Sequence, residues 1–324
     1  MSGAINFVVA RENFATLTSR PTPAPRYIVE RGRLPVSAAR VCVWTWRAFT
    51  HIGAVRNVLG LLAKIPPYSA MVQNDPRFSY KFLTDDYLAR GFSTSDRASC
   101  FIHHYSRLRE LLPGQLLRQI LQDEITLHEF PGGGDRFAVT MGLSRPYDNE
   151  GELTLRLRVD GDIVFVLSFT MVPGSVVESP AAEALLITRL QGVKGCYRQI
   201  GDATKALYDV APAQILLAAL QGVASAFDIR AIAAIPAERQ SSFKKEAARA
   251  FKDSYDNLFS AVGLSKSETG FFSSAVPIDQ KPLTSIKRGH KLRTREKRAF
   301  KQRIQSACAA FLQECVRFYS ARAS

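Results

Sequence analysis

The sequence lacks the signatures of several large protein classes. Its five cysteines are scattered and never form a C-x-x-C pair, which argues against a disulfide framework and a zinc site. No run of about 18 apolar residues occurs, so we expect no membrane-spanning helix. The N-terminal apolar stretch has no basic start and is too short for a signal peptide. We therefore expect a cytoplasmic location, with the surface of a membrane as an open alternative.

Motifs that would identify a reaction are also missing. Thr204-Lys205 resembles the end of a phosphate loop, but no upstream G-x-x-x-x-G precedes it. Ser168 is not part of a G-x-S-x-G turn, which argues against a serine hydrolase. The histidines have no metal-ligand spacing, and one of the adjacent pair His103-His104 should face a core. The catalytic residues therefore stay unknown, and we expect no metal.

Positive charge is present in excess and is concentrated in one segment. The formal net charge is +14, and residues 287–303 contain one acid, Glu296. A second, acid-free zone runs from Arg31 to Asn74. Such stretches attract phosphate groups of lipid or nucleic acid, although a solvated helix face is the ordinary alternative. The candidate residues for binding an anionic surface are Lys287, Arg288, Lys291, Arg293, Arg295, Lys297 and Arg298.

Periodicity predicts a helical N-terminal half followed by a sheet. Residues 1–35 form a proline-containing arm, and 36–123 have a helical pattern, with helices near Phe78–Ala89 and from Ser93 or Ser95. Residues 124–283 form a mixed-sheet core. Residues 284–324 form a basic C-terminal helix whose apolar stripe includes Ile304, Cys308, Phe311, Leu312, Cys315 and Phe318.

Within the sheet region, two strand pairs are predicted. Residues 152–159 alternate as in a half-buried strand, and Asp160-Gly161 indicates a hairpin to a central strand at 163–172. Ala184–Leu190 should lie parallel to Ala231–Ile235, with a right-handed connection through a helix opened by Pro212. The intervening 20-residue loop is basic and offers candidate phosphate ligands, with a surface helix bearing a basic face as the ordinary alternative. These candidates are Gly192, Lys194, Arg198, Thr204 and Lys205.

Several short motifs, taken in order, resemble the VirK family of Gram-negative bacteria. They are His103-His104-Tyr105, Tyr147 to Leu153, Leu190-Gln191-Gly192, Ala203 to Leu207 and Gly270-Phe271-Phe272. The resemblance implies a role in virulence, in surface localisation of an autotransporter and in resistance to antimicrobial peptides, with no established reaction. The chain departs from the family at Ala237 to Gln240 and at Ala213.

The antiparallel strands followed by strand–helix–strand are also similar to acyl-CoA-dependent N-acyltransferases of the GNAT type. We therefore predict an α+β protein with an N-terminal helical layer on a GNAT-like mixed sheet, closed by the basic C-terminal amphipathic helix. Acyl-CoA is the cofactor that the resemblance suggests, and whether the protein is an enzyme stays open. The alternative is a non-enzymatic accessory that binds anionic lipid or a secreted client protein. Nucleic-acid binding is weaker, because residues 287–303 have few aromatic side chains for stacking.

Overall fold

The structure is a computed structural model, and it describes residues 38–74, 77–144 and 149–321. The chain divides into two units, 1–36 and 37–324, of which the second contains every element below. The predicted arm at 1–35 lies outside the described residues, as do Tyr147 and Asp148 of the VirK-like motif.

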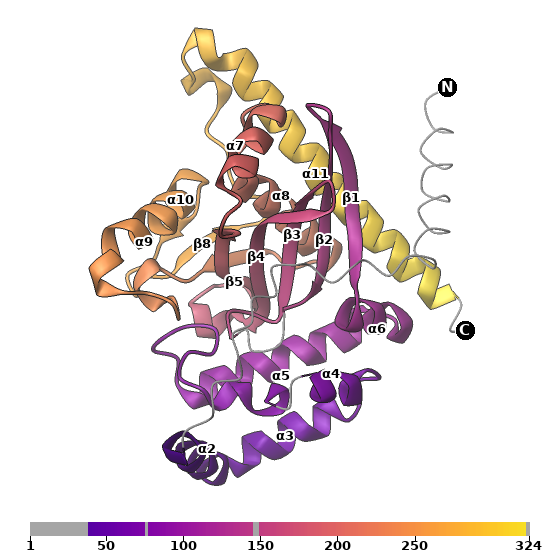
Figure 1. Cartoon of the computed structure of the whole chain (residues 1–324), viewed down its shortest axis with the longest axis vertical. Coiled ribbons are helices and arrows are strands. Elements are labelled where there is room, and N and C mark those ends of the chain that lie inside the picture. The colour runs from indigo at the N-terminus through magenta and orange to yellow at the C-terminus, as the bar shows by residue number, and fades with distance from the viewer. Residues whose placement is uncertain (1–37, 75–76, 145–148, 322–324) are drawn as a thin grey trace. The chain divides into compact units, whose positions relative to one another are not determined.

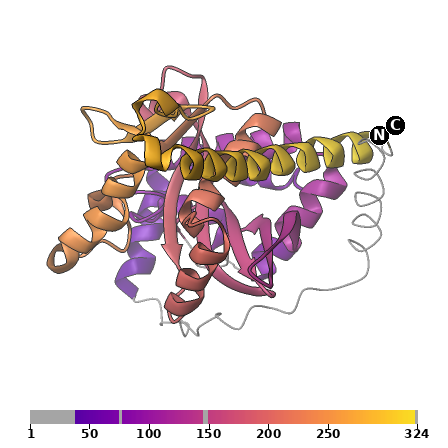
Figure 2. The same cartoon turned by 90° about the horizontal axis from the view of Figure 1, so that it is seen from above.

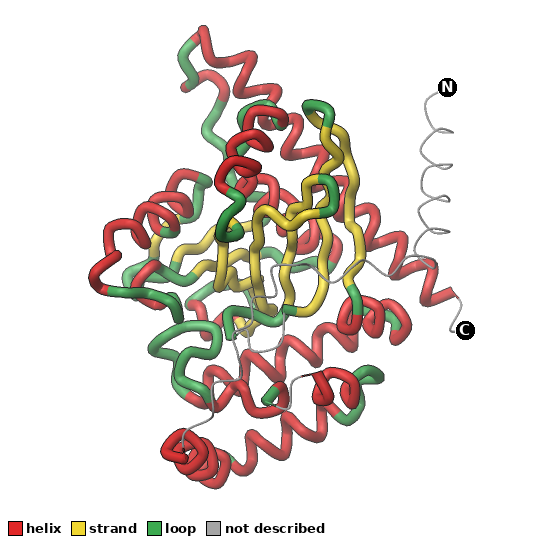
Figure 3. Tube along the Cα trace, in the orientation of Figure 1, coloured by secondary structure: helices red, strands yellow, loops and turns green. Residues whose placement is uncertain are grey.

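Helices precede and follow the sheet, as the sequence predicts (Figure 3). In Figure 1, α5 crosses below the central strands, and α2, α3 and α4 lie beneath it. The elements before the sheet are α2 (Ala38–Thr50), α3 (Ile52–Leu62), α4 (Tyr68–Asn74), the 3₁₀-helix η1 (Phe78–Leu83), α5 (Thr94–Leu111) and α6 (Gly114–Gln122). Those after the first five strands are α7 (Tyr197–Ala206), α8 (Pro212–Ala226), α9 (Ala248–Ser254), α10 (Asp256–Ala261) and α11 (Lys291–Ala321).

The sheet has eight strands in the order β1-β2-β3-β4-β5-β6-β8-β7. Neighbouring strands are antiparallel except for the parallel pair β5 and β6. The strands are β1 (Glu124–Gly132), β2 (Asp135–Leu143), β3 (Leu153–Val159), β4 (Asp162–Pro173), β5 (Glu183–Gly192), β6 (Ala231–Ala234), β7 (Ser265–Lys266) and β8 (Phe272–Ala275). Both predicted strand pairings are therefore confirmed, and the predicted α+β class with them.

At the β3–β4 hairpin and at the start of α5, residues close in sequence determine the structure that was predicted. Asp160 and Gly161 have positive φ angles of 48° and 94°, as a type I′ turn requires. Ser93 caps α5, because its hydroxyl accepts the Asp96 N–H while the Asp96 carboxylate accepts the Ser93 N–H. This reciprocal capping satisfies donors that the first helical turn leaves free.

The 20-residue segment after β5 contains the exposed helix α7, the surface helix that was the alternative to a phosphate-binding loop. Two other local predictions are wrong. The predicted helix near Phe78–Ala89 is only the short η1, because the chain turns at Thr84 and Leu88 has a φ of 62°. Strand β3 is buried on both faces, because its polar side chains find partners: Arg156 and Arg158 pair with Glu124, and Thr154 hydrogen-bonds to Ser144 and Ser168.

The helix α11 packs on the body as predicted, with Ile304, Cys308, Leu312 and Cys315 buried. It lies along one side of the sheet against α8 (Figure 2). Gly222 of α8 makes the crossing close, since a Cβ at this position would lie 2.4 Å from the Gln305 carbonyl oxygen. The two helices therefore meet backbone to backbone at this point.

A buried ion pair joins the helical layer to the sheet. Glu152, just before β3, lies 2.7 Å from the Lys81 Nζ of η1, and both side chains are almost inaccessible to water. Its two carboxylate oxygens accept hydrogen bonds of 2.5 Å from Tyr87 and Tyr105. Burial, and then the Glu152 charge, raises the pKa of both phenols far above 10, so they stay protonated donors.

We expect Lys81→Met to lower the free energy of unfolding by about 3–5 kcal/mol, because it leaves the Glu152 charge buried without its cation. Urea denaturation measures this loss. The double variant Lys81→Met/Glu152→Gln should lose less than the sum of the single variants, since the two groups interact. Lys252→Met is the matched control: its pair with Glu238 is mostly exposed (54% and 66%), and its loss should stay within about 1 kcal/mol. If Lys81→Met and Lys252→Met lowered the free energy of unfolding equally, the buried pair of Lys81 and Glu152 would contribute no more to stability than an exposed one.

Candidate functional site

The parallel strands β5 and β6 separate soon after they pair. Their register covers Leu185–Ile187 with Ile232–Ala234, and the Ile235 N–H then donates to the Ile187 carbonyl at 3.1 Å. Beyond this point β5 continues to Gly192, whereas β6 has ended. On this side of β5, the described residues supply no further strand partner. The backbone N–H and C=O groups on this edge of β5 can therefore form hydrogen bonds with groups other than a strand.

A β-bulge lies at the same place. Ser168 of β4 pairs with Arg189 and Phe169 pairs with Ile187, so Thr188 is the extra residue. Its hydroxyl donates to the Glu150 carbonyl at 2.6 Å and lies 3.3 Å from the Ser168 carbonyl. Bulges re-aim side chains and occur often beside active sites.

Glu150 extends into this region from the segment before β3. One carboxylate oxygen accepts the Ser241 hydroxyl at 2.5 Å, and the other lies 3.5 Å from the Arg189 Nε. Ser241 comes from the loop after β6, so one carboxylate connects three parts of the chain that are distant in sequence.

Tyr255 occupies the space where the strands have parted. Its side chain is buried at the junction of α9 and α10. Burial, with a contribution from the Glu150 charge, raises the Tyr255 pKa to about 12, against the opposing effects of Arg189 and a hydrogen bond with the Leu190 backbone. At neutral pH this phenol is therefore a proton donor. We call Glu150, Thr188, Arg189, Ser241 and Tyr255 the strand-separation site.

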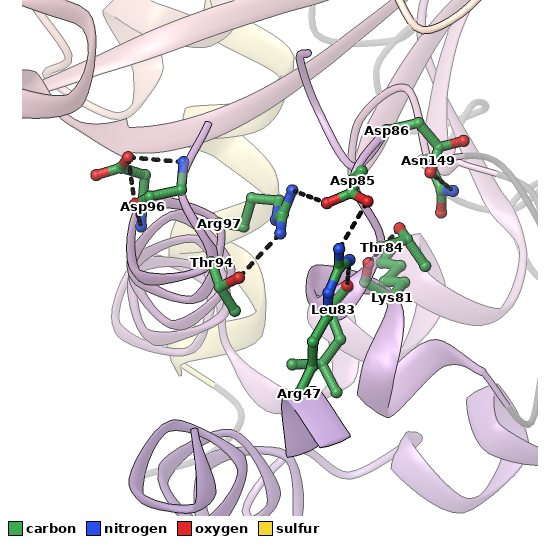
Figure 4. Close-up of polar contacts among 11 residues, drawn as sticks. Arg47, Lys81, Leu83, Thr84, Asp85, Asp86, Thr94, Asp96, Arg97 and Asn149 are labelled. Carbon is green, nitrogen blue, oxygen red and sulfur yellow. Dashed lines mark hydrogen bonds and ion pairs between the residues drawn. The ribbon is translucent and has the colours of Figure 1, made fainter. Parts of the chain in front are cut away.

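The loop between η1 and α5 reaches this site. The Leu88 N–H donates to the Asn149 carbonyl at 2.8 Å, next to Glu150. The Arg90 backbone donates to Arg239, and its guanidinium donates to the Ser241 carbonyl at 2.7 Å. Figure 4 shows the neighbouring Asp86 and Asn149 side chains turned toward each other. The helical layer thus fixes two of the backbone segments that carry the site.

The predicted phosphate ligands lie on the adjacent loop and on α7. Gly192 ends β5, where a Cβ would lie 2.6 Å from the Ile200 side chain. Lys194 is exposed in the loop, and the Thr204 hydroxyl donates to the Ile200 carbonyl at 2.8 Å. Arg198 and Lys205 lie in the first and last turns of α7, so they do not converge at one helix start, and each lies within 4.0 Å of Asp202. Their binding role stays a prediction.

The seven basic residues at the C-terminal helix fall into two groups. Arg293 and Lys297 contact Asp209, and Arg298 donates to the Lys281 carbonyl. The other four are exposed and have no charged or hydrogen-bonded partner among the described residues: Lys287, Arg288, Lys291 and Arg295.

A small pocket lies beside the crossing of α8 and α11. It has room for about 40 Å³ and is lined by Gln214, Gln221, Lys301, Gln302 and Gln305 among others. Burial lowers the Lys301 pKa, as do the neighbouring charges of Arg298 and Lys297. This space suits water or a small ion and not an acyl-CoA.

Neither member of the histidine pair assembles a metal centre. His104 is fully buried, its Nδ1 accepts the Met171 N–H at 3.1 Å, and burial holds its pKa well below 6.5. His103 lies 3.1 Å from a Glu183 oxygen. Within the described ranges no cluster of three or more potential ligands occurs. No helix among the described residues is long and apolar enough to cross a membrane.

Sequence reasoning did not find the strand-separation site. It predicted no role for Glu150, Ser241 or Tyr255. A weak signal existed for Tyr255, because Phe251, Tyr255 and Phe259 repeat every four residues, as in one buried helical face. Nothing local marks Glu150, whose partners come from β5 and from the loop after β6.

Comparison with known proteins gives one match. A family model described as "Protein of unknown function (DUF535)" matches residues 36–310. No curated protein and no solved structure is significantly similar to the chain.

The Tyr255 pKa predicts how stability depends on pH. The unfolded phenol titrates near 10 and the folded one near 12, so the stability due to this difference is complete below pH 10 and is lost as pH rises toward 12. Between pH 9 and pH 11 the free energy of unfolding should therefore fall by about 1.4 kcal/mol more in the wild type than in Tyr255→Phe. Urea denaturation across this range measures it, and Tyr197→Phe, at an exposed position, should leave the pH dependence unchanged. An identical pH dependence for Tyr255→Phe and the wild type would contradict the raised pKa.

Proposed function

The chain belongs to the DUF535 family of proteins of unknown function, and we propose that it is an acyl-CoA-dependent transferase acting at the strand-separation site. The observation that carries this proposal is the protonated Tyr255 held beside Glu150 where β5 and β6 part. A buried acid, a fixed carboxylate and an edge of β5 that has no neighbouring strand among the described residues are together suited to bind and cleave a thioester.

The residues have distinct roles in this reaction. An acceptor amine attacks the thioester carbonyl carbon, the carbon–sulfur bond breaks, and the leaving thiolate takes a proton from the Tyr255 hydroxyl. The proton that the amine loses passes to solvent, and Tyr255 is reprotonated in turn. Arg189 and Ser241 fix the position of the Glu150 carboxylate, whose negative charge lies near Tyr255. General acid catalysis of this type contributes about 10²- to 10⁴-fold to a rate.

The surroundings of the site fit the phosphates of such a substrate. Four residues separate the end of β5 from the start of α7, and no side chain caps that start. Free N–H groups at a helix start attract anions, and Lys194 and the Arg198 side chain (95% exposed) stand beside them. Five antiparallel strands followed by a helix-connected parallel strand also accord with the GNAT-type resemblance.

The VirK resemblance supplies the biological setting of the proposal. An acyltransferase that modifies an envelope precursor or a protein amine would support virulence, surface protein localisation and resistance to antimicrobial peptides. In this setting the protein works in the cytoplasm, at or near the inner membrane.

Calorimetric titration with acyl-CoA tests the proposal. Wild type should bind, and Lys194→Ala and Arg198→Ala should each weaken binding by about 1.5–3 kcal/mol, the range for hydrogen bonds to charged groups. Arg230→Ala is the control, because Arg230 is similarly exposed and also pairs with an aspartate, at the other end of β6. Tyr255→Phe should retain binding and lose acyl transfer to an amine. The absence of acyl-CoA binding in the wild type would reject the proposal.

A second candidate is a non-enzymatic accessory that attaches to anionic lipid or a client protein. The exposed cations Lys287, Arg288, Lys291 and Arg295 favour it, because no acidic side chain in the described part of the chain forms an ion pair with them. Each basic residue near an anionic leaflet contributes about 1 kcal/mol.

Flotation with phosphatidylglycerol vesicles tests this second candidate. Changing these four residues to Gln should weaken attachment at low salt and leave the thermal midpoint unchanged, since their side chains have no charged or hydrogen-bonded partner among the described residues. Attachment by wild type through these cations should also be lost near 0.5 M salt, where the Debye length is about 4 Å. If the fourfold variant floats like the wild type at low salt, these cations are only a solvated surface.

A further inference from the structure

The helix α2 and the start of α3 expose an unusual amount of apolar surface. Val43, Trp46, Phe49 and Ile52 are 46%, 68%, 74% and 57% exposed, and they follow one another at intervals of three residues. Large apolar side chains that gather on one side of a helix mark a contact surface for another body. We call these four residues the α2 apolar surface.

The exposure does not result from a loosely attached helix. The Arg47 guanidinium donates to the Leu83 carbonyl and to the Asp85 carboxylate, both at 2.7 Å, and Arg97 lies 3.3 Å from the same carboxylate (Figure 4). The Arg47 hydrogen bond, together with the charges of Arg47 and Arg97, outweighs the opposing effect of burial and holds the Asp85 pKa below its usual value. The opposite side of α3 is buried through Val55, Val58 and Leu62. Both helices therefore present a fixed outer side.

The charge around the surface selects the occupant. From Arg31 to Asn74 the chain contains no Asp or Glu, and Arg56 and Lys64 are exposed on and after α3. A second copy would bring one cationic surface against another. Residues 1–37 of the chain itself contain five Arg and two Glu, so this segment would also add positive charge. An anionic bilayer complements both the positive charge and the apolar side chains, since its phosphates pair with the cations and its interface accepts Trp and Phe.

We propose that the α2 apolar surface inserts into the headgroup region of an anionic membrane and attaches the protein peripherally. The α2 axis then lies in the plane of the interface, as expected for a helix of 13 residues that is too short to span. This attachment does not require acyl transfer, and it uses a surface separate from the cations near the start of α11.

The two tryptophans of the chain provide the test, because Trp44 and Trp46 both lie in α2. In the full-length Trp44→Phe variant, Trp46 is the only fluorophore of this kind. Adding phosphatidylglycerol-containing vesicles should move its emission to shorter wavelength and protect it from iodide and acrylamide. The shift should persist in part at 0.5 M salt, because insertion of apolar side chains is not screened. Vesicles of phosphatidylcholine alone should bind more weakly.

Two further changes in this background locate the contact. Phe49→Ser/Ile52→Ser should weaken vesicle binding by about 100-fold, because burying each side chain is worth at least about 1.5 kcal/mol. Leu292→Ser removes a similarly exposed apolar side chain elsewhere and should change nothing. All three residues are at exposed positions, so the thermal midpoint confirms that each variant folds. Binding of acyl-CoA should be the same in all of them, which separates this result from the proposed reaction.

Three results would overturn the proposal. One is an unchanged Trp46 emission in the presence of anionic vesicles. Another is protection of Trp46 from quenchers before vesicles are added, which would show that the chain covers its own surface. The third is a mass in sedimentation that rises with concentration and returns to the monomer value in Phe49→Ser/Ile52→Ser, which would identify a second copy as the occupant.

Discussion

The structure depends on how one carboxylate is satisfied inside the protein. Glu152 is completely buried, and the cation and two phenols that contact it come from η1, from the turn after η1 and from α5. A charge in this position has a large desolvation cost unless all its partners are in place. The helical layer can therefore pack on the sheet in one arrangement only, the arrangement that brings Lys81, Tyr87 and Tyr105 together.

The same constraint sets the geometry of the strand-separation site. Glu150 lies two residues before Glu152, and Gly151 between them has a φ of 126°. A Cβ on Gly151 would lie 2.9 Å from the Thr188 hydroxyl, so the backbone approaches β5 as closely as glycine permits. With Glu152 held on the side of the helices, Glu150 is directed toward Arg189 and Ser241. A structural ion pair thus positions a carboxylate of the candidate site.

The sequence predicts those parts of the structure that neighbouring residues determine. The Asp160-Gly161 hairpin, the Ser93 cap and the apolar stripe from Ile304 to Cys315 each depend on residues a few positions apart. The ion pair of Lys81 with Glu152 and the meeting of Glu150, Ser241 and Tyr255 depend on the order of strands in the sheet. No local pattern contains that order, which is why no role for Glu150 could be predicted. The error at β3 has the same origin, because the partner that covers Arg156 and Arg158 is Glu124 of β1.

The close crossing of α8 and α11 makes these two helices a single rigid unit. The contact at Gly222 includes no flexible side chain that could absorb a displacement, since the Gln305 carbonyl lies directly against it. The helix α8 also carries the chain from α7 to β6, so it is connected to both sides of the strand separation. Side-chain rearrangement alone therefore cannot accommodate a shift of α11 against α8 at this point, and the two helices form one rigid support behind the sheet.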